Sequence, residues 1–391
     1  MLHAKLLKLQ ANQKDTMRSW RLFLTILLVL LSGPHLLHAE KIVITAPQTS
    51  LLPHYNLAAT ALNIAQGSNI IKLDVVMTKD DQLVLLSATD LAPFTNIAEL
   101  YPERNREDGS YLVFDFGLEE LQSLQIHQAA APIDPDLQTS HYSSLRISSL
   151  AEVLSFLPQI EQATGKTIGI MIEAKQSWQH QREQKDLSAA IVQHLADFDF
   201  FLPPQMVMLA SYDPDLLKAL DSALPDLQRQ KIQLYQFIDF NNGDEHKSQE
   251  GARWIGYDYQ WMFTKFGLRL VSDYADGLGL HPEFIYDHNN QPIRPSYFEN
   301  ARLLELKLLV YPFDHLLTTG QPGQNEALIN DYLFTASLDG IITTNPKVFD
   351  DIITTKLTEQ AAELESPKTP IELFLENAKK EQAETEEIIK P

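Results

Sequence analysis

Cysteine is absent from the 391 residues of the sequence. The chain therefore forms no disulfide, and it offers no thiol for lipid attachment behind a leader peptide. Basic side chains are also scarce: 31 Lys and Arg stand against 52 Asp and Glu, giving a net charge of −21 and a pI of about 4.9. Because nucleic-acid binding needs a clustered excess of Lys and Arg, the composition argues against a nucleic-acid partner.

The sequence also has no apolar run near its start that is long enough to span a bilayer. Arg18 and Arg21 precede an apolar run at residues 22–31, about half of the roughly 20 residues that a spanning helix needs. A Gly33-Pro34 break and the small residue Ala39 follow. This order predicts a secretory leader cut after Ala39, with an uncleaved anchor as the alternative. We therefore expect no stable membrane span, and a soluble protein secreted across the inner membrane into a periplasm.

The chain is expected to divide into unequal parts. Residues 1–39 comprise an N-terminal extension and the signal peptide, and either Met1 or Met17 is the true start. Residues 40–355 have the composition and patterning of a folded domain. Residues 356–391, dominated by Glu and Lys, are expected to form an acidic, flexible tail that could contact a basic partner.

Short runs rich in β-branched residues alternate with stretches of helical period, which is typical of βα units. The expected strands lie at residues 41–46, 70–78, 82–88, 167–175, 206–211, 231–238, 275–280, 307–313 and 339–345. Ser149 with Glu152 predicts a helix start, and Gly165 its end. The pattern predicts an α/β fold, a (β/α)₈ TIM-type barrel with one extra hairpin strand, and an open doubly wound sheet is the alternative. Residues 92–148, long and poorly periodic, are expected to be an insertion after the second and third strands.

Lys72 precedes Asp74 by two residues within one expected strand. Side chains at i and i+2 of a strand project to the same face, so this ammonium and carboxylate share one space. In a barrel, the C-terminal ends of the strands form the site. Those ends carry Ala46, Lys72 with Asp74, Ser87, Glu173 with Lys175, Ser211, Tyr311 and Thr344.

Several segments together carry a family resemblance. In chain order they read IVITAPQTSLLPHYNL, LDVVMTKDDQLVLL, YPERNREDGSYLVFDF, IGIMIEAK, and YDYQWMF followed by YADGLG. In content and order they resemble the periplasmic glycerophosphodiester phosphodiesterases of lipid metabolism. The resemblance implies a (β/α)₈ barrel that binds calcium or magnesium through carboxylates. It also implies a phosphoric diester hydrolase in which two histidines act as general acid and base, cutting glycerophosphodiesters to glycerol 3-phosphate and an alcohol.

The chain departs from this family pattern where the chemistry resides. The two family histidine positions hold Ala46 and Ser87, and the first residue of the Glu-x-Asp metal pair is Lys72. Asp74 and Glu173 remain as residual metal ligands. Neither alanine nor serine titrates near neutrality, and an ammonium among the ligands of a hard cation removes an oxygen and repels the ion. No catalytic residue of the pattern is intact, and we expect no cofactor, with calcium or magnesium bound only if the residual site still holds a metal.

The expected pocket residues are Lys72, Asp74, Glu173, Lys175 and Tyr311, the last in place of a further family histidine. We expect the Lys72 ammonium to stand in for the missing cation and to pair with Asp74 and Glu173, because two inward carboxylates without a counter-charge are costly. The alternative is that Lys72 extends to solvent and these pairs do not form.

Three functions remain open at this point. The first is a pseudoenzyme: an exported, catalytically impaired barrel that binds a small phosphodiester-like ligand or a protein partner. The second is an active phosphodiesterase with displaced groups, in which His54 or Tyr311 acts as acid or base. His54 is otherwise expected to cap the helix that follows it or to lie on that helix's surface. The third is a lipid-cleaving phospholipase-type barrel, which also depends on a histidine pair and is weakened by the same substitutions.

Overall fold

The computed structural model describes residues 41–47, 52–126, 144–197, 206–241, 243–287, 293–313, 327–329, 331–335 and 338–365. The expected leader and the end of the acidic tail lie outside these residues.

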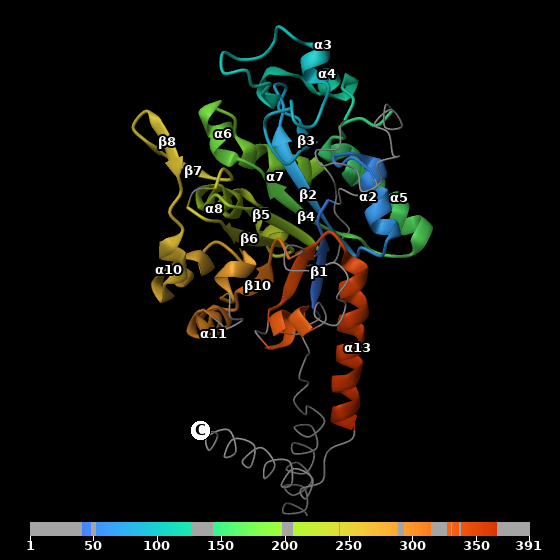
Figure 1. The fold of residues 1–391 in the computed structure, drawn as a ribbon, viewed down its shortest axis with the longest axis vertical. Coiled ribbons are helices and arrows are strands. Elements are labelled where there is room, and N and C mark those ends of the chain that lie inside the picture. The colour runs from blue at the N-terminus through green and yellow to red at the C-terminus, as the bar shows by residue number, and fades with distance from the viewer. Residues whose placement is uncertain are drawn as a thin grey trace, which may run out of the picture. The chain divides into compact units, whose positions relative to one another are not determined.

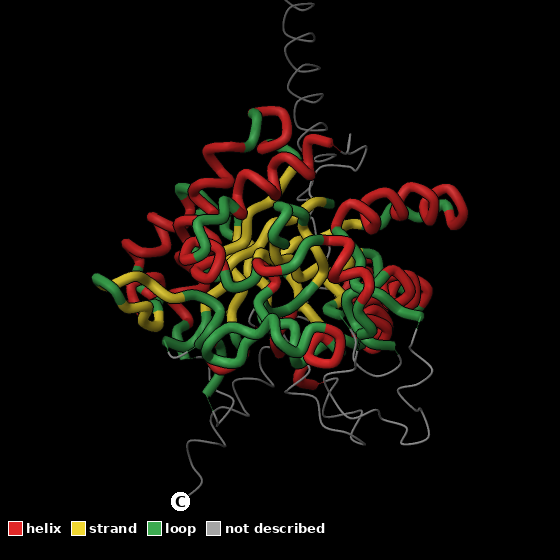
Figure 2. The backbone as a smooth tube through the Cα atoms, turned by 90° about the horizontal axis from the view of Figure 1, so that it is seen from above, coloured by secondary structure: helices red, strands yellow, loops and turns green. Residues whose placement is uncertain are grey.

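Eight parallel strands close into a barrel, with helices around it (Figures 1 and 2). In ring order the strands are β1 (Ile42–Thr45), β2 (Ile70–Met77), β4 (Gly169–Ala174), β5 (Val207–Ser211), β6 (Ile232–Ile238), β9 (Gly277–Leu280), β10 (Lys307–Val310) and β11 (Gly340–Thr343). Because β1 pairs with both β2 and β11, the ring of eight parallel strands is closed. The predicted (β/α)₈ barrel is confirmed, and closure excludes the open doubly wound sheet. The extra hairpin strand is β3 (Leu83–Leu85), antiparallel to β2.

Helices follow most of the strands and pack on the outside of the barrel. They are α2 (Leu57–Ala65), α5 (Leu150–Thr164), α6 (Ser177–Arg182), α7 (Leu187–Asp197), α8 (Pro214–Ala223), α9 (Asp226–Arg229), α10 (Lys265–Ser272), α11 (Pro295–Leu303) and α13 (Pro346–Glu365). The expected capping box starts α5: Ser149 Oγ accepts from the Glu152 amide at 3.1 Å, and Gly165 ends the helix at φ 70°. Helix α13 continues past Lys356, where the tail was expected to begin. In the described part of the chain, no helix combines the length and apolarity needed to cross a bilayer.

The interior of the barrel is filled by inward side chains of alternate strand positions. They include Ile44, Met171, Met208, Tyr235, Phe237, Leu309 and Ile342. Two glycines of β9 admit the largest rings: a Cβ on Gly277 would lie 2.4 Å from Tyr235, and one on Gly279 would lie 2.2 Å from Phe237. A second and larger cluster of buried hydrophobic residues lies between the strands and the surrounding helices. Charged inward side chains, those of Lys72, Asp74 and Glu173, lie beyond this apolar packing toward the C-terminal ends of β2 and β4.

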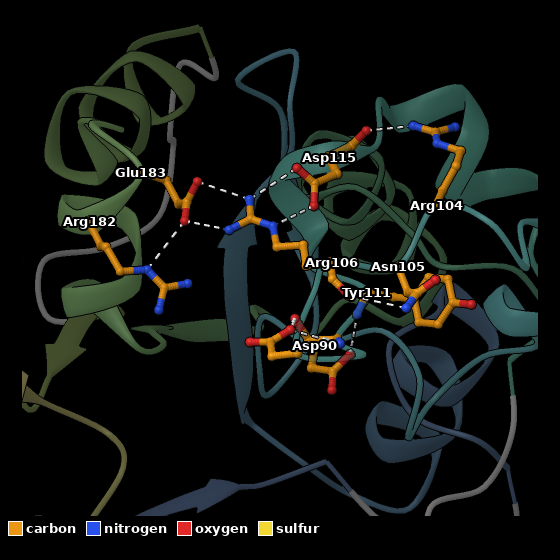
Figure 3. Close-up of polar contacts among 10 residues, drawn as sticks. Asp90, Arg104, Asn105, Arg106, Tyr111, Asp115, Arg182 and Glu183 are labelled. Atoms are coloured by element: carbon orange, nitrogen blue, oxygen red, sulfur yellow. Dashed lines mark hydrogen bonds and ion pairs between the residues drawn. The ribbon is translucent and has the colours of Figure 1, made fainter.

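The expected insertion contains α3 (Ile97–Leu100), the 3₁₀ turn η1 (Val113–Asp115) and α4 (Leu118–Ser123), and its residues 127–143 lie outside the described part. Arg106 fastens it to the barrel (Figure 3): it donates to both oxygens of Asp115 at 2.8 and 3.0 Å and to both of Glu183 at 2.7 and 2.9 Å. Glu183 directly follows α6, the helix after β4. Just before the insertion, the amide and hydroxyl of Thr89 donate to Gln176 Oε1 at 2.8 and 2.9 Å and tie the end of the preceding segment to the loop after β4.

A second hairpin, β7 (Lys247–Glu250) with β8 (Arg253–Gly256), projects from the loop after β6 (Figure 1). The sequence did not predict it, because KSQE and RWIG show no alternation of apolar and polar residues. Trp178 and Trp254 pack against each other with ring centroids 5.7 Å apart and hold the hairpin against α6.

Candidate functional site

Two neighbouring strands supply the charged residues of the barrel mouth. Strand β2 pairs with β4 in a register that places Lys72 opposite Met171 and Asp74 opposite Glu173. Ile70 and Met171 belong to the interior cluster, so the residues two and four positions along from Ile70 face inward as well. The side chains of Lys72 and Glu173 are 0% exposed and that of Asp74 is 8% exposed. Strand alternation and parallel register therefore bring four charged side chains into one buried layer. They are Lys72, Asp74, Glu173 and Lys175.

The Lys72 ammonium lies between two carboxylates. Its Nζ pairs with Asp74 Oδ1 and lies 2.5 Å from Glu173 Oε2. Glu173 in turn lies between two ammonium groups, since Lys175 Nζ is 2.7 Å from its Oε1. Lys175 also pairs with Glu245 Oε1 at 2.5 Å. The alternative in which Lys72 extends to solvent does not occur.

Electrostatic pairing outweighs burial in fixing these charges. Burial by itself lowers the pKa of Lys72, but the carboxylates of Asp74 and Glu173 raise it well above its ordinary value. Burial raises the pKa of Glu173, and the two lysines reverse this, so that its pKa is lowered. The pKa of Lys175 is raised for the same reason as that of Lys72. These three groups stay charged near neutrality, so none of them exchanges a proton readily in the way that general acid–base catalysis requires.

Two tyrosines complete the layer above the charges. The Lys72 Nζ lies 4.9 Å from the centroid of the Tyr311 ring, and burial raises the pKa of the Tyr311 phenol. Tyr55 donates to Ser87 Oγ at 2.6 Å, and burial raises its pKa to about 12. The backbone of Tyr55 is left-handed at φ 68°, a conformation that is unfavourable for a bulky residue and that clusters at functional sites.

A cavity of about 390 Å³ opens over this layer, and we call it the mouth cavity. Its lining residues are Ala46, Pro47, His54, Tyr55, Asp74, Ser87, Tyr311, Pro312 and Thr344. The structure thus brings Ala46, Ser87, Asp74 and Tyr311, all singled out from the sequence, to one space. Lys72 lies below it, lining a narrow crevice of about 20 Å³ with Asp74 and His54. Glu173 and Lys175 are buried and do not line the mouth cavity.

Some residues of the site were missed or misread in the sequence. Glu245 lies in the loop after β6, 70 residues from Lys175 in the chain. No local sequence pattern predicts its contact with Lys175. His54 does not cap α2: Asn56 does, accepting from the Ala59 amide at 3.0 Å. The signal for this was present, because asparagine is among the preferred N-cap residues and histidine is not.

Comparison with known proteins identifies the family. A family model described as the glycerophosphoryl diester phosphodiesterase family matches residues 51–348. The chain belongs to this family. The glycerophosphodiester phosphodiesterase of Treponema pallidum is 31% identical over 236 residues, covering 58% of this chain and 66% of the relative. That of Haemophilus influenzae is 31% identical over 250 residues, covering 62% and 69%. The chain therefore spans about two thirds of the length of these relatives.

Solved structures of the family share the fold. A glycerophosphoryl diester phosphodiesterase of Silicibacter pomeroyi matches with a TM-score of 0.56 at 16% identity, covering 82% of this chain and 95% of that one. An Oleispira antarctica phosphodiesterase, solved with the product sn-glycerol-3-phosphate, matches with a TM-score of 0.53 at 18% identity, covering 80% and 96%. At these identities the likeness concerns the barrel itself.

The carboxylates of this glycerophosphodiester phosphodiesterase family member do not fit a divalent cation as they stand. A hard cation takes six or more oxygen ligands, yet Asp74 and Glu173 both contact the Lys72 ammonium. Within the described ranges, no group of three or more His, Asp or Glu side chains could hold a metal ion. An ion at this position would meet a buried positive charge in direct contact with both residual ligands.

Proposed function

We propose that this glycerophosphodiester phosphodiesterase-like protein does not hydrolyse diesters by the cation-dependent route and acts by binding a ligand in its mouth cavity. One observation carries the proposal: the Lys72 ammonium lies between Asp74 and Glu173, the two residual ligand positions. The side chains at the two family histidine positions, Ala46 and Ser87, support it, since neither exchanges a proton near neutrality. A phosphodiester-like molecule is the ligand class that family membership suggests, with a protein partner as the alternative.

A second candidate is hydrolysis by displaced groups, and one observation favours it. His54 lines both the mouth cavity and the crevice beside Asp74, so an imidazole is present at the site although not at a family histidine position. Histidine is the side chain best suited to proton transfer near neutral pH, and such transfer contributes about 10²- to 10⁴-fold in rate.

An activity assay distinguishes these candidates. Purified protein is incubated with glycerophosphocholine, with added calcium or with EDTA, and released glycerol 3-phosphate and bound metal are measured. We expect release at the level of the no-protein blank in both conditions. Calcium-dependent release that is lost in Glu173→Gln would overturn the proposal. Release that persists in EDTA and is lost in His54→Gln, but not in the control His194→Gln on α7, would establish the second candidate.

We also propose export to a periplasm, on the basis of the apolar run at residues 22–31 and the small residue Ala39. N-terminal sequencing of the protein purified from its native source should give Glu40 as the first residue. A sequence that starts at Met1 or Met17 would contradict cleavage.

A further inference from the structure

We propose that the outer face of helix α10 docks on a lipid surface that carries anionic headgroups. The inference concerns the outside of the barrel. It goes beyond the proposed function, and it does not depend on whether the mouth cavity binds or hydrolyses its ligand.

The packing of α10 fixes which of its side chains face outward. Gly267, Leu268 and Val271 are buried. A Cβ on Gly267 would lie 1.9 Å from the Trp261 carbonyl oxygen, so the helix lies directly against the backbone of the 3₁₀ turn η3 (Gln260–Phe263). This close approach leaves the opposite face of α10 exposed on the outside of the barrel, next to α11 (Figure 1).

The outward face carries two large apolar side chains. Phe266 is 71% exposed and Leu270 is 40% exposed. Residues four apart on a helix are neighbours on one face, so these two side chains form one apolar strip. Among the large exposed apolar residues of the described part of the chain, they alone have this spacing on one helix. The strip therefore differs from singly exposed apolar residues such as Leu227, which are normal on protein surfaces.

Two basic side chains lie beside this strip. Lys265 and Arg269, also four residues apart, are exposed, and neither pairs with a carboxylate of the described residues. With 3.6 residues per turn, both lie next to Phe266 and Leu270 on the outward half of the helix. This combination is typical of helices that lie on membranes, with the apolar side chains among the acyl chains and the cations at the lipid phosphates.

The acidic groups of the chain are compatible with this docking. Asp273, the one carboxylate on α10 and its two cap positions, is the C-cap, at the far end from Lys265 and Phe266. The net charge of −21 belongs to the whole chain. At about 0.1 M salt the Debye length is roughly 10 Å, so an anionic surface interacts mainly with the side chains nearest to it. Repulsion of the acidic remainder favours the orientation in which the start of α10 faces the lipid.

A second copy of the chain fits this face less well than lipid does. A two-fold contact would bring Lys265 and Arg269 of one copy toward the same residues of the other, and like charges repel. Two exposed apolar side chains also fall far short of the roughly 800 Å² that each partner buries in a stable protein interface.

Vesicle co-sedimentation tests the inference with a chain that starts at Glu40, so that the apolar run at residues 22–31 does not itself bind lipid. The probes are vesicles of phosphatidylcholine alone and vesicles that also contain about 30% phosphatidylglycerol. We expect about tenfold tighter binding to the anionic vesicles at about 0.1 M salt, and weaker binding as the salt concentration rises.

Paired variants separate the apolar contribution from the charged one. Phe266→Ser combined with Leu270→Ser should weaken binding to the anionic vesicles about tenfold. Leu227→Ser, at an apolar side chain that is 76% exposed on α9, is the matched control and should leave binding unchanged. Lys265→Gln combined with Arg269→Gln should remove most of the preference for anionic vesicles.

The control for the charges is Lys166→Gln combined with Lys231→Gln, at two exposed lysines elsewhere on the chain, which should keep the preference. Phe266→Trp gives a direct readout, because its fluorescence should shift to shorter wavelength on anionic vesicles while that of Leu227→Trp should not. Thermal unfolding checks that each variant folds.

Three results would overturn the inference. The first is equal binding to both kinds of vesicle, or binding to neither. The second is the same loss of binding in the Leu227→Ser control as in the α10 variants. The third is a dimer in analytical ultracentrifugation that Phe266→Ser dissociates, since a second copy would then occupy this face.

Discussion

Replacing Lys72 by methionine removes the buried positive charge while keeping a side chain of similar length. The change leaves Asp74 and Glu173, with side chains 8% and 0% exposed, facing each other without the ammonium between them. Breaking a buried ion pair by removing one partner costs about 3–5 kcal/mol. Because Lys175 still contacts Glu173 at 2.7 Å, we expect a loss near the lower end, about 3 kcal/mol.

The pH dependence of this loss follows from the charges that remain. Without Lys72, repulsion between Asp74 and Glu173 favours the protonated form, so the carboxyl pKa in the folded variant moves up. A carboxyl whose folded pKa is raised destabilises the fold above its unfolded pKa, and the cost disappears as the pH falls and the group takes a proton. The difference between wild type and Lys72→Met should therefore be larger at pH 8 than at pH 5.

Guanidinium unfolding followed by tryptophan fluorescence at both pH values measures this difference. The matched control is Lys218→Met, because Lys218 is 52% exposed and its partner Asp215 is 79% exposed at 3.0 Å. Exposed pairs of this kind contribute little, so the control midpoint should hardly move. A Lys72→Met midpoint equal to that of Lys218→Met, or a loss that does not change with pH, would refute the role assigned to the buried ammonium.

Further predictions concern the metal, the insertion and a buried histidine. Lys72→Glu should create a calcium site. Calcium at 100 times its Kd should then raise the variant's free energy of unfolding by about 2.7 kcal/mol and leave that of the wild type unchanged. A variant whose melting temperature does not change with calcium would contradict this prediction. Arg106→Ala should lower the free energy of unfolding by about 1–2 kcal/mol, because the Arg106 side chain is 28% exposed and its guanidinium pairs with Asp115 and Glu183. The variant should also be cleaved faster by proteases within residues 88–126, and unchanged cleavage rates would contradict the anchoring role. Burial lowers the pKa of His180 to about 4. Between pH 6.5 and 4 the unfolded chain therefore binds a proton that the folded chain does not, and stability should fall by about 3 kcal/mol. His180→Gln should remove this pH dependence of the free energy of unfolding. An unchanged pH dependence in the variant would show that His180 is not its source.

The barrel was predictable because its signals are local. Short β-branched runs separated by helical stretches gave the eight ring strands and β3, and the Ser149 capping box with Gly165 gave both ends of α5. Polar segments without a period gave no such signal, which is why the β7–β8 hairpin was not foreseen. The end of α13 at Glu365 was missed for a related reason: the segment's charge suggested a tail, whereas its many Leu, Ala, Glu and Lys residues favour helix.

The candidate site was only partly predictable, and the two parts differ in physical origin. That Lys72 and Asp74 share a face follows from strand alternation alone. Glu245 contacts Lys175 from a loop whose conformation no sequence pattern predicts. Tyr55, which has a left-handed backbone, contacts Ser87, 32 residues away in the chain. Both contacts depend on the conformations that the loops adopt on the folded barrel.

The amino-acid sequence by itself determined the repeating βα order, the family, and the presence of a lysine where a carboxylate would complete a metal pair. Only the tertiary structure decided that the Lys72 ammonium lies between Asp74 and Glu173, because their meeting needs β2 and β4, far apart in the chain, to pair in one particular register. Alternation fixes which face a side chain takes, whereas the register between strands is set by closure of the whole ring and the packing of its interior.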